Sequence, residues 1–315
     1  MARAEPPAAR SAWTVAPPGQ PQARVRLLGD AIVFACPGMR NTTQRHAATL
    51  LCSTDGQALQ ARCQGHTVQA PALLIAPMAC KTVDALDRPL LLIDLEPGHP
   101  HYRHFQALAA PGVQALQGAP CAALQDLGRA FAAGRLQGQA VDAQVREAVA
   151  AVAHQLPQPK PLDPRVRKLM CLLDEDPGAA LERLAPSLGL SANHASRLFH
   201  QGLGLPLRRY ALSIKIRAAA SFMGSGLALT QIAQAAGFVD SAHFAKVWAQ
   251  NYGAAPSRFF DTANTHIDQT DQPDWLLWYL AQRDRDLPPP APGAQTPWVH
   301  RRRTPRTPRL RTAAP

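Results

Sequence analysis

The fold is decided by one pattern that occurs twice in the second half of the chain. Its first copy spans residues 184–210 and reads LAPSLGLSANHASRLFHQGLGLPLRRY. Its second copy spans residues 232–259 and reads IAQAAGFVDSAHFAKVWAQNYGAAPSRF. In both copies, apolar residues recur at helical spacing on either side of a glycine, and a second glycine and a proline follow. Each copy therefore predicts two short helices joined by a tight turn.

Turn and cap residues fit two helix-turn-helix units. Gly189 lies where a left-handed residue lets one short helix turn into the next. The expected helix N-caps are Asp176, Ser191, Thr230 and Asp240. A helix from Pro206 to about Met223 joins the units as a rod of roughly 25 Å, whereas neighbouring major-groove faces of a duplex are about 34 Å apart. The pair predicts a reader that enters two adjacent grooves.

Residues 163–261 resemble the DNA-binding domain of the AraC/XylS family of bacterial transcription regulators. The residues that carry the resemblance are Gly237-Phe238, His243-Phe244, Gly253, Pro256 and Phe259. It implies reading helices near 192–201 and 241–252. It also implies that the residues facing DNA are Asn193, His194, Ser196, Arg197, Ser241, Ala242 and Lys246. Arg197 suits a bidentate contact to guanine, and Lys246 is a point charge for guanine or phosphate.

One residue departs from this pattern. Pro186 lies inside the first helix of the first unit, where it removes the backbone hydrogen bond to Glu182 and is expected to bend the helix. A bend would weaken or re-aim the first reading helix, so the second unit is the safer prediction. Single amphipathic helix pairs occur in many all-α domains, but two copies in register, with Arg197 and Lys246 at equivalent places, favour DNA reading.

The first half has the pattern of a β-protein. Short apolar or alternating runs begin at residue 24 and recur at intervals of about 8–12 residues between Gly and Pro, which predicts a sandwich or small barrel. This layout resembles the cupin-like sensor domain often found ahead of an AraC-type reader. The expected fold class is α+β with two domains. An all-β cupin-like barrel with following helices precedes an all-α domain of two helix-turn-helix units joined by a linker helix.

The barrel lacks the ligand set of a metal-binding cupin. That set has two histidines one residue apart, an acid and a later histidine, whereas this chain offers only His46 at the first place and Lys81 near the last. We therefore expect no metal, no cofactor and no enzymatic activity. The candidate effector-binding residues are His46, Cys52, His66 and Lys81, which strand alternation can turn inward. Lys81 suggests an anionic effector, although a lysine on a short strand is more often at a rim in water.

Residues 120–156 predict two helices, the first ending near Gly134 and the second capped by Asp142. The second carries an apolar stripe that packs on the barrel, on the other helix or on a second protomer. Packing within one chain is the default, and dimerisation is the alternative that the family resemblance favours. The nearby residues His99, His101 and His104 are interpreted as an exposed loop rather than as a metal site.

Composition divides the chain into five segments. We expect a disordered N-terminus (1–22), a cupin-like effector-sensing domain with a helical extension (23–156), a Pro-rich linker (157–164), the double helix-turn-helix domain (165–261) and a basic, mostly disordered tail (262–315). The net charge is +11, of which +5 falls in residues 158–261. Residues 301–311 carry six arginines and no acid. Such a run can add phosphate affinity that falls with salt.

Cysteine spacing and the length of apolar runs indicate the cellular compartment. The six cysteines include no Cys-x-x-Cys pair, which favours a reducing compartment. The sequence shows neither a signal peptide nor a run of about 20 apolar residues. We therefore expect a cytoplasmic protein that does not enter a membrane.

The patterns together predict a sequence-specific transcription regulator of AraC type, controlled by a small organic effector in the barrel. The expected partners are double-stranded promoter DNA, the effector, RNA polymerase and a second copy of the chain. Two alternatives stay open: a cupin-type enzyme with an appended DNA-binding module, and an architectural binder that uses the basic tail without regard to DNA sequence.

Overall fold

A computed structural model of the chain describes residues 11–16 and 23–268. Its strands are β1 (Ala12–Trp13), β2 (Ala23–Leu27), β3 (Ala31–Cys36), β4 (Met39–Gln44), β5 (Ala48–Ser53), β6 (Leu59–Cys63), β7 (His66–Ala70), β8 (Ala72–Ile75), β9 (Cys80–Ala85), β10 (Leu90–Leu95), β11 (Val113–Ala115) and β12 (Thr265–Ile267). They form one sheet in the order β1-β4-β9-β6-β7 and a second in the order β11-β8-β5-β10-β3-β2-β12. The described pairings are antiparallel except for β12 with β2.

Side-chain alternation gives the larger sheet two buried faces. In β10, Leu90 and Leu92 pack toward the smaller sheet, whereas Leu91 and Ile93 pack under helices. An all-β first half is therefore confirmed, in the form of two facing sheets. Its assignment to the cupin type stays a prediction. Strand β4 is not evident from the sequence, because of its inward residues only Met39 is apolar, whereas Asn41 and Thr43 are polar.

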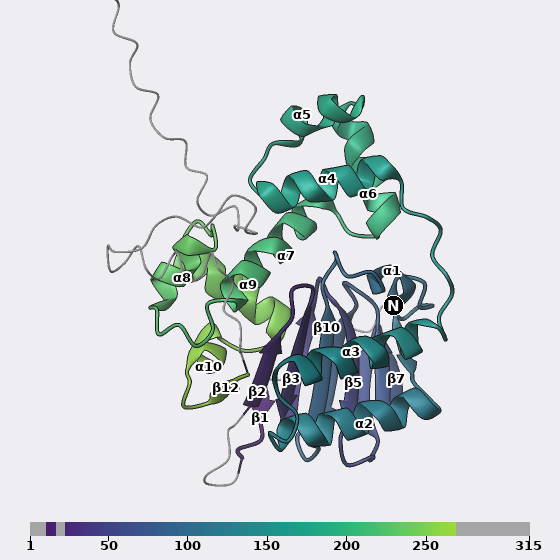
Figure 1. Ribbon diagram of the computed structural model, residues 1–315, viewed down its shortest axis with the longest axis vertical. Coiled ribbons are helices and arrows are strands. Elements are labelled where there is room, and N and C mark those ends of the chain that lie inside the picture. Colours follow the sequence, from purple (N-terminus) through teal and green to yellow (C-terminus); the bar gives the residue numbers. More distant parts are fainter. Residues whose placement is uncertain (1–10, 17–22, 269–315) are drawn as a thin grey trace, which may run out of the picture.

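Helices α2 (Ala119–Ala132) and α3 (Gly138–Ala153) cover the outer face of the larger sheet (Figure 1). The apolar stripe of α3 is buried against this face and α2, so it belongs to the core of a single chain. The homodimer stays a prediction. The expected cap at Asp142 is wrong, because α3 begins four residues earlier. The Asp142 carboxylate instead accepts hydrogen bonds from the buried Arg26 side chain at 2.9 and 2.8 Å.

The second half is helical. Its elements are α4 (Pro164–Glu175), α5 (Leu181–Leu184), the 3-10 turn Ala185–Leu188, α6 (Ala192–Leu203), α7 (Leu207–Ala220), α8 (Leu229–Ala235), α9 (Ser241–Tyr252) and α10 (Pro256–Phe260). Figure 1 shows α4, α5 and α6 as one group and α8, α9 and α10 as another beside the strands, with α7 running between them. The expected linker helix from Pro206 is thus present.

The two helical groups differ in where they bury their apolar residues. Phe199, Leu203 and Tyr210 of the first group form a core with α4 that is separate from the sheets. Phe244, Trp248 and Phe259 of the second group belong to the same core as the inner face of the sandwich. The second helix-turn-helix unit therefore closes the sandwich.

Two segments expected to lie outside the fold contribute strands. Residues 11–16 contain β1, because the Trp13 ring packs edge-on against Phe34 and Phe259, each with ring centroids 6.0 Å apart. Beyond residue 261, β12 pairs with β2 and covers a sheet edge. The expected disorder of these two short stretches is wrong. The Arg-rich run 301–311 lies outside the described residues. No helix in the described part is long and apolar enough to cross a bilayer.

Candidate nucleic-acid interface

The first unit contains a break at its proline. Helix α5 ends at Leu184, and the chain continues as a 3-10 turn that contains Pro186. The expected disturbance of this helix is confirmed, because proline cannot supply the backbone N–H of an α-helical turn. Gly189 follows with φ 67° and turns the chain into α6. The left-handed conformation is one that glycine adopts without a Cβ clash.

Helix α6 has one buried and one exposed face. Its expected N-cap is confirmed: the Ser191 hydroxyl accepts a hydrogen bond from the His194 backbone N–H at 3.3 Å. Ala195, Phe199 and Leu203 are buried. The opposite face is exposed and carries Asn193, His194, Ser196 and Arg197.

Helix α9 repeats this arrangement. Gly237 has φ 73°, and the Asp240 carboxylate caps the helix by accepting a bond from the His243 N–H at 2.6 Å. Phe244 and Trp248 are buried, whereas Lys246 is exposed. Of the remaining expected DNA-facing residues, Ala242 is exposed and Ser241 is half-buried.

Two of the expected caps are wrong. Helix α8 begins at Leu229, one residue before Thr230, and the Gln231 side chain accepts a bond from the Ala228 N–H at 3.1 Å. Asp176 ends α4 rather than opening the next helix, and its carboxylate binds the Gly178 N–H at 3.0 Å. At Asp176 a neighbouring backbone N–H competes for the polar side chain.

The two cations at equivalent places are not neutralised within the fold. Neither Arg197 nor Lys246 joins any ion pair found among the described residues. By contrast, Arg183 on α5 pairs with Asp176 at 2.8 Å. Arg217 on α7 pairs with Asp174 at 3.6 Å. Two unpaired cations on exposed faces are available for phosphate or base edges.

The C-terminal end of each reading helix is hydrogen-bonded to the first half of the chain. The Arg103 side chain donates a hydrogen bond to the Gly202 carbonyl of α6 at 2.9 Å. The Asn41 amide donates to the Tyr252 carbonyl of α9 at 3.3 Å. Arg45 lies over the Tyr252 ring at 5.6 Å. The sequence analysis missed these contacts, because nothing in a single polar residue indicates a partner far along the chain.

Two of the candidate effector-binding residues are buried near this junction. His46 is 4% exposed, and neither of its ring nitrogens has a hydrogen-bond partner. Burial and the nearby Arg209 lower its pKa to about 4. Lys81 is 3% exposed and faces the space between the sheets, so the expected alternative of a rim position is wrong. Burial, followed by repulsion from Arg45, lowers its pKa to about 7.

The other two candidates lie elsewhere, and this part of the prediction is wrong. Cys52 packs on the outer face of the larger sheet beneath α2, because odd and even positions of β5 face opposite sides. Burial raises the pKa of its thiol to about 12. His66 is exposed at the start of β7. The four residues therefore do not converge on one pocket.

The three clustered histidines are not a free loop. They surround the short helix α1 (Tyr102–Phe105), and ring centroids are 5.6 Å apart for His99 and His101 and 5.3 Å apart for His101 and His104. His104 is buried and bonds Gln158 at 3.2 Å, which corrects the expectation of exposure. Within residues 11–16 and 23–268, no group of three His, Cys, Asp or Glu side chains is placed to hold a metal ion.

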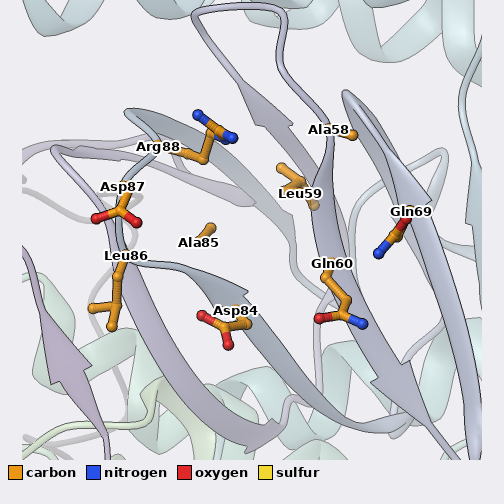
Figure 2. Close-up of a pocket in the computed structure, with 9 residues that line it drawn as sticks. All are labelled: Ala58, Leu59, Gln60, Gln69, Asp84, Ala85, Leu86, Asp87 and Arg88. Carbon is orange, nitrogen blue, oxygen red and sulfur yellow. The ribbon is translucent and has the colours of Figure 1, made fainter.

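Two hollows stand out. One is an open depression of about 230 Å³ on the smaller sheet. Figure 2 shows Gln60, Gln69 and Asp84 on three neighbouring strands beside the turn that carries Arg88. Two of its charges are already paired, Asp84 with Arg40 at 2.9 Å and Arg88 with Asp55 at 3.9 Å. The other hollow is smaller and lies where the sandwich meets the second helix-turn-helix unit.

Comparison with known families decides the nature of the helical half. A family model described as a helix-turn-helix domain matches residues 184–262. This region is an AraC-type helix-turn-helix domain. The match covers both α6 and α9. A comparison with curated proteins gave no match.

Two solved structures of ToxT share the fold of this chain. An apo variant of ToxT from Vibrio cholerae has 12% identity and a TM-score of 0.52, and the match covers 75% of this chain and 98% of that chain. Unsaturated fatty acid bound wild-type ToxT from the same organism has 11% identity and a TM-score of 0.50, with 74% and 95% covered. An AraC-type transcriptional regulator from Chromobacterium violaceum has 23% identity and a TM-score of 0.28, with 31% and 88% covered. At these identities the ToxT likeness concerns the fold.

Proposed function

We propose that the chain is a sequence-specific DNA-binding transcription regulator whose activity is set by a small organic effector bound in its first half. The observation that carries the proposal is the pair of capped, exposed helices α6 and α9. They present Arg197 and Lys246 at equivalent places in an AraC-type domain, and neither cation has an ion-pair partner among the described residues.

The proposed contacts follow from side-chain chemistry. The planar guanidinium of Arg197 donates two parallel hydrogen bonds to the acceptors of guanine in the major groove. The ammonium of Lys246 serves guanine or phosphate as a point charge. Asn193 and His194 on α6 and Ser241 and Ala242 on α9 lie near these cations on the first turns, and Ser196 lies beside Arg197.

An effector in the first half is supported by the cations inside the sandwich. Lys81 and Arg45 are buried close to Asp94, whose carboxylate pairs with Arg45, so an organic anion would balance the charge of a protonated Lys81. The fatty acid bound by the structurally similar ToxT is also an anion. We assign residues 23–156 as the sensing domain, 157–164 as the linker and 165–261 as the reader. A homodimer and RNA polymerase complete the proposed partners.

The experiment is selection of bound sequences from a random DNA pool by the full chain, repeated with a metabolite extract. Enrichment of one motif with two half-elements about one helical turn apart supports two reading helices. A truncation after residue 268 keeps every described element and removes the Arg-rich run. Retained selection by this truncation supports the helix-turn-helix reader. Binding without any enriched motif, lost on truncation, would instead identify an architectural binder.

A further inference from the structure

The outward faces of the two reading helices can be compared position by position, because the second unit repeats the first. The caps Ser191 and Asp240 are 49 residues apart, and so are Gly204 and Gly253 at the ends of the helices. At about 100° per residue, four positions of each helix share one sector opposite the buried rings. These positions hold Asn193, Ser196, Arg197 and His200 in α6, and Ala242, Ala245, Lys246 and Ala249 in α9.

The two sectors differ in chemistry. All four side chains on α6 are exposed and carry hydrogen-bonding groups. On α9 three of the four residues are alanines, of which Ala242 is exposed and Ala245 and Ala249 are half-buried. Lys246 is the single polar residue of this sector. Equivalent places therefore present hydrogen-bonding groups in the first unit and mostly methyl groups in the second.

A further apolar side chain lies at the N-terminal end of α9. The turn before this helix is one residue longer than the turn before α6, and the added residue is Val239. Its side chain is 86% exposed, whereas the neighbouring Phe238 is buried. In helix-turn-helix proteins the N-terminal residues of the second helix contact base edges. Val239 thus extends the apolar surface at the end of α9 that approaches a base pair.

The helix caps point to the same difference. The Asp240 carboxylate caps α9 with a negative charge, whereas the neutral Ser191 hydroxyl caps α6. A negative charge at a helix N-terminus offsets the positive end of the helix dipole, which otherwise attracts phosphate. The N-terminal end of α9 is therefore the poorer phosphate site, and its contribution to DNA reading depends more on apolar contact.

We propose that the two reading helices recognise chemically different half-elements, and that α9 selects thymine through its C5 methyl group. Of the four standard bases only thymine carries a methyl group in the major groove, where small apolar side chains contact it. Val239, Ala242 and Ala245 supply this contact. On α6, Asn193 matches adenine and Arg197 matches guanine through paired hydrogen bonds. The inference rests on the proposed DNA-reading function and adds the class of base that each helix reads.

The first step of the test assigns each half-element to a helix. Bound sequences are selected from a random DNA pool by the full chain as wild type, as Arg197→Ala and as Lys246→Ala. The half-element whose base preferences a variant changes belongs to the helix that carries the substituted cation. If wild type enriches no motif, the proposed function fails and the inference fails with it. A motif with a single half-element, or one that neither variant changes, overturns the inference alone.

The second step removes the methyl group from the DNA. Deoxyuridine replaces thymine and differs from it only by lacking this group. In the α9 half-element we expect each contacted thymine to lose about three- to fivefold in affinity, the effect of one buried methyl group. In the α6 half-element we expect a change below about 1.5-fold, whereas 7-deazaguanine, which lacks the N7 acceptor, is expected to weaken binding by about tenfold or more.

Two outcomes of this step would overturn the proposal. Deoxyuridine without effect in the α9 half-element would show that α9 contacts DNA without reading thymine. An equal effect of deoxyuridine in both half-elements would show that the two helices do not differ in the class of base that they read. Neither outcome affects the proposed function, because the selected motif stands in both.

Exchange of a residue between the helices is the converse test. Ala242→Asn gives α9 the residue that α6 carries at the equivalent place. It is expected to enrich adenine in place of thymine at one position of the α9 half-element, because asparagine forms two hydrogen bonds to adenine. Ala143→Asn is the matched control, at an exposed position of α3 on the outer face of the larger sheet (Figure 1), and is expected to select the wild-type motif. An unchanged thymine preference in folded Ala242→Asn would overturn the assignment.

Val239→Thr tests the residue in the turn. Threonine has nearly the same shape as valine and replaces one methyl group by a hydroxyl group. We expect this variant to weaken binding of the selected motif by about two- to fivefold. It should also reduce the loss caused by deoxyuridine at the contacted thymine, because both changes remove the same contact. Wild-type affinity together with a wild-type response to deoxyuridine would overturn the role of Val239.

Discussion

The side-chain oxygen of Asn251 accepts a hydrogen bond from the backbone N–H of His46 at 3.1 Å. Asn251 lies on the buried, inner end of the second reading helix, and His46 lies in the turn just before β5. A polar contact thus joins a helix proposed to read DNA to the domain proposed to sense an effector. The contact makes the orientation of α9 depend on the sandwich.

Removal of this contact is expected to loosen the junction. Asn251→Ala leaves the buried His46 N–H without its acceptor and is expected to lower the free energy of unfolding by about 1–3 kcal/mol. Chemical denaturation measures the change. Gln250→Ala, at an exposed neighbouring position on the same helix, is the control and is expected to change stability by less than about 0.5 kcal/mol. Equal effects of the two substitutions would contradict the role of Asn251.

The two exposed cations are expected to dominate specific DNA affinity. Arg197→Ala and Lys246→Ala are each expected to cost about 1–3 kcal/mol against a selected motif if they contact bases. Titrations at matched salt measure the loss. Arg183→Ala is the control, because Arg183 is exposed in the same unit but paired with Asp176. Wild-type affinity in both test variants would show that these residues do not read DNA.

The end of α9 approaches the sandwich so closely that only glycine fits. A Cβ on Gly253 would lie 2.7 Å from the Asn41 Cβ, and the residue has φ +78°. Gly253→Ala is therefore expected to combine a left-handed penalty of about 1–2 kcal/mol with an overpacking cost of about 1–3 kcal/mol.

The matched control for this substitution is Gly226→Ala, because Gly226 has φ +70° and nothing within 4 Å of its added Cβ. It is expected to show only the left-handed penalty. Thermal or denaturant unfolding of both variants gives the difference. Equal destabilisation of the two variants would mean that the close approach of Asn41 adds no cost at position 253.

Burial of Lys81 makes the free energy of unfolding depend on pH between about 7 and 10.5. The pKa of Lys81 in the folded chain is lowered to about 7 from its ordinary value of 10.5, first because of burial. Between these values the unfolded chain binds the proton and the folded chain does not, so this residue makes stability rise with pH by up to about 1.4 kcal/mol per unit. The contribution is present above pH 10.5 and is lost as the pH falls to about 7.

A substitution isolates this contribution. Lys81→Met removes the titrating group, so its stability relative to wild type is expected to be highest near pH 7 and to decline toward pH 10. Urea unfolding at several pH values measures the difference. Glu96 titrates with the opposite sign below this window, because burial raises its pKa to about 7. A pH-independent difference between Lys81→Met and wild type would show that Lys81 is not desolvated.

Turn and cap residues correctly predicted most of the helices in the second half of the chain. Gly189, Ser191 and Asp240 act within a few residues of their own position, and each does so as their neighbours predict. The expected cap is wrong at Asp176, where a second local partner competes, and at Thr230, where the helix begins one residue earlier. Strands were missed where most inward residues are polar, as in β4, and where only two or three residues pair, as in β1 and β12.

By itself, the sequence determined that the chain carries two capped, glycine-turned helix pairs behind an all-β half, because turns, caps and apolar periodicity are short-range properties. Only the tertiary structure decided that Trp13 and the second helix pair close the sandwich, and that Cys52 faces outward. Strand order and docking bring together residues such as Asn41 and Tyr252 that lie far apart in the chain. The free energy of these contacts depends on buried partners that no local pattern encodes.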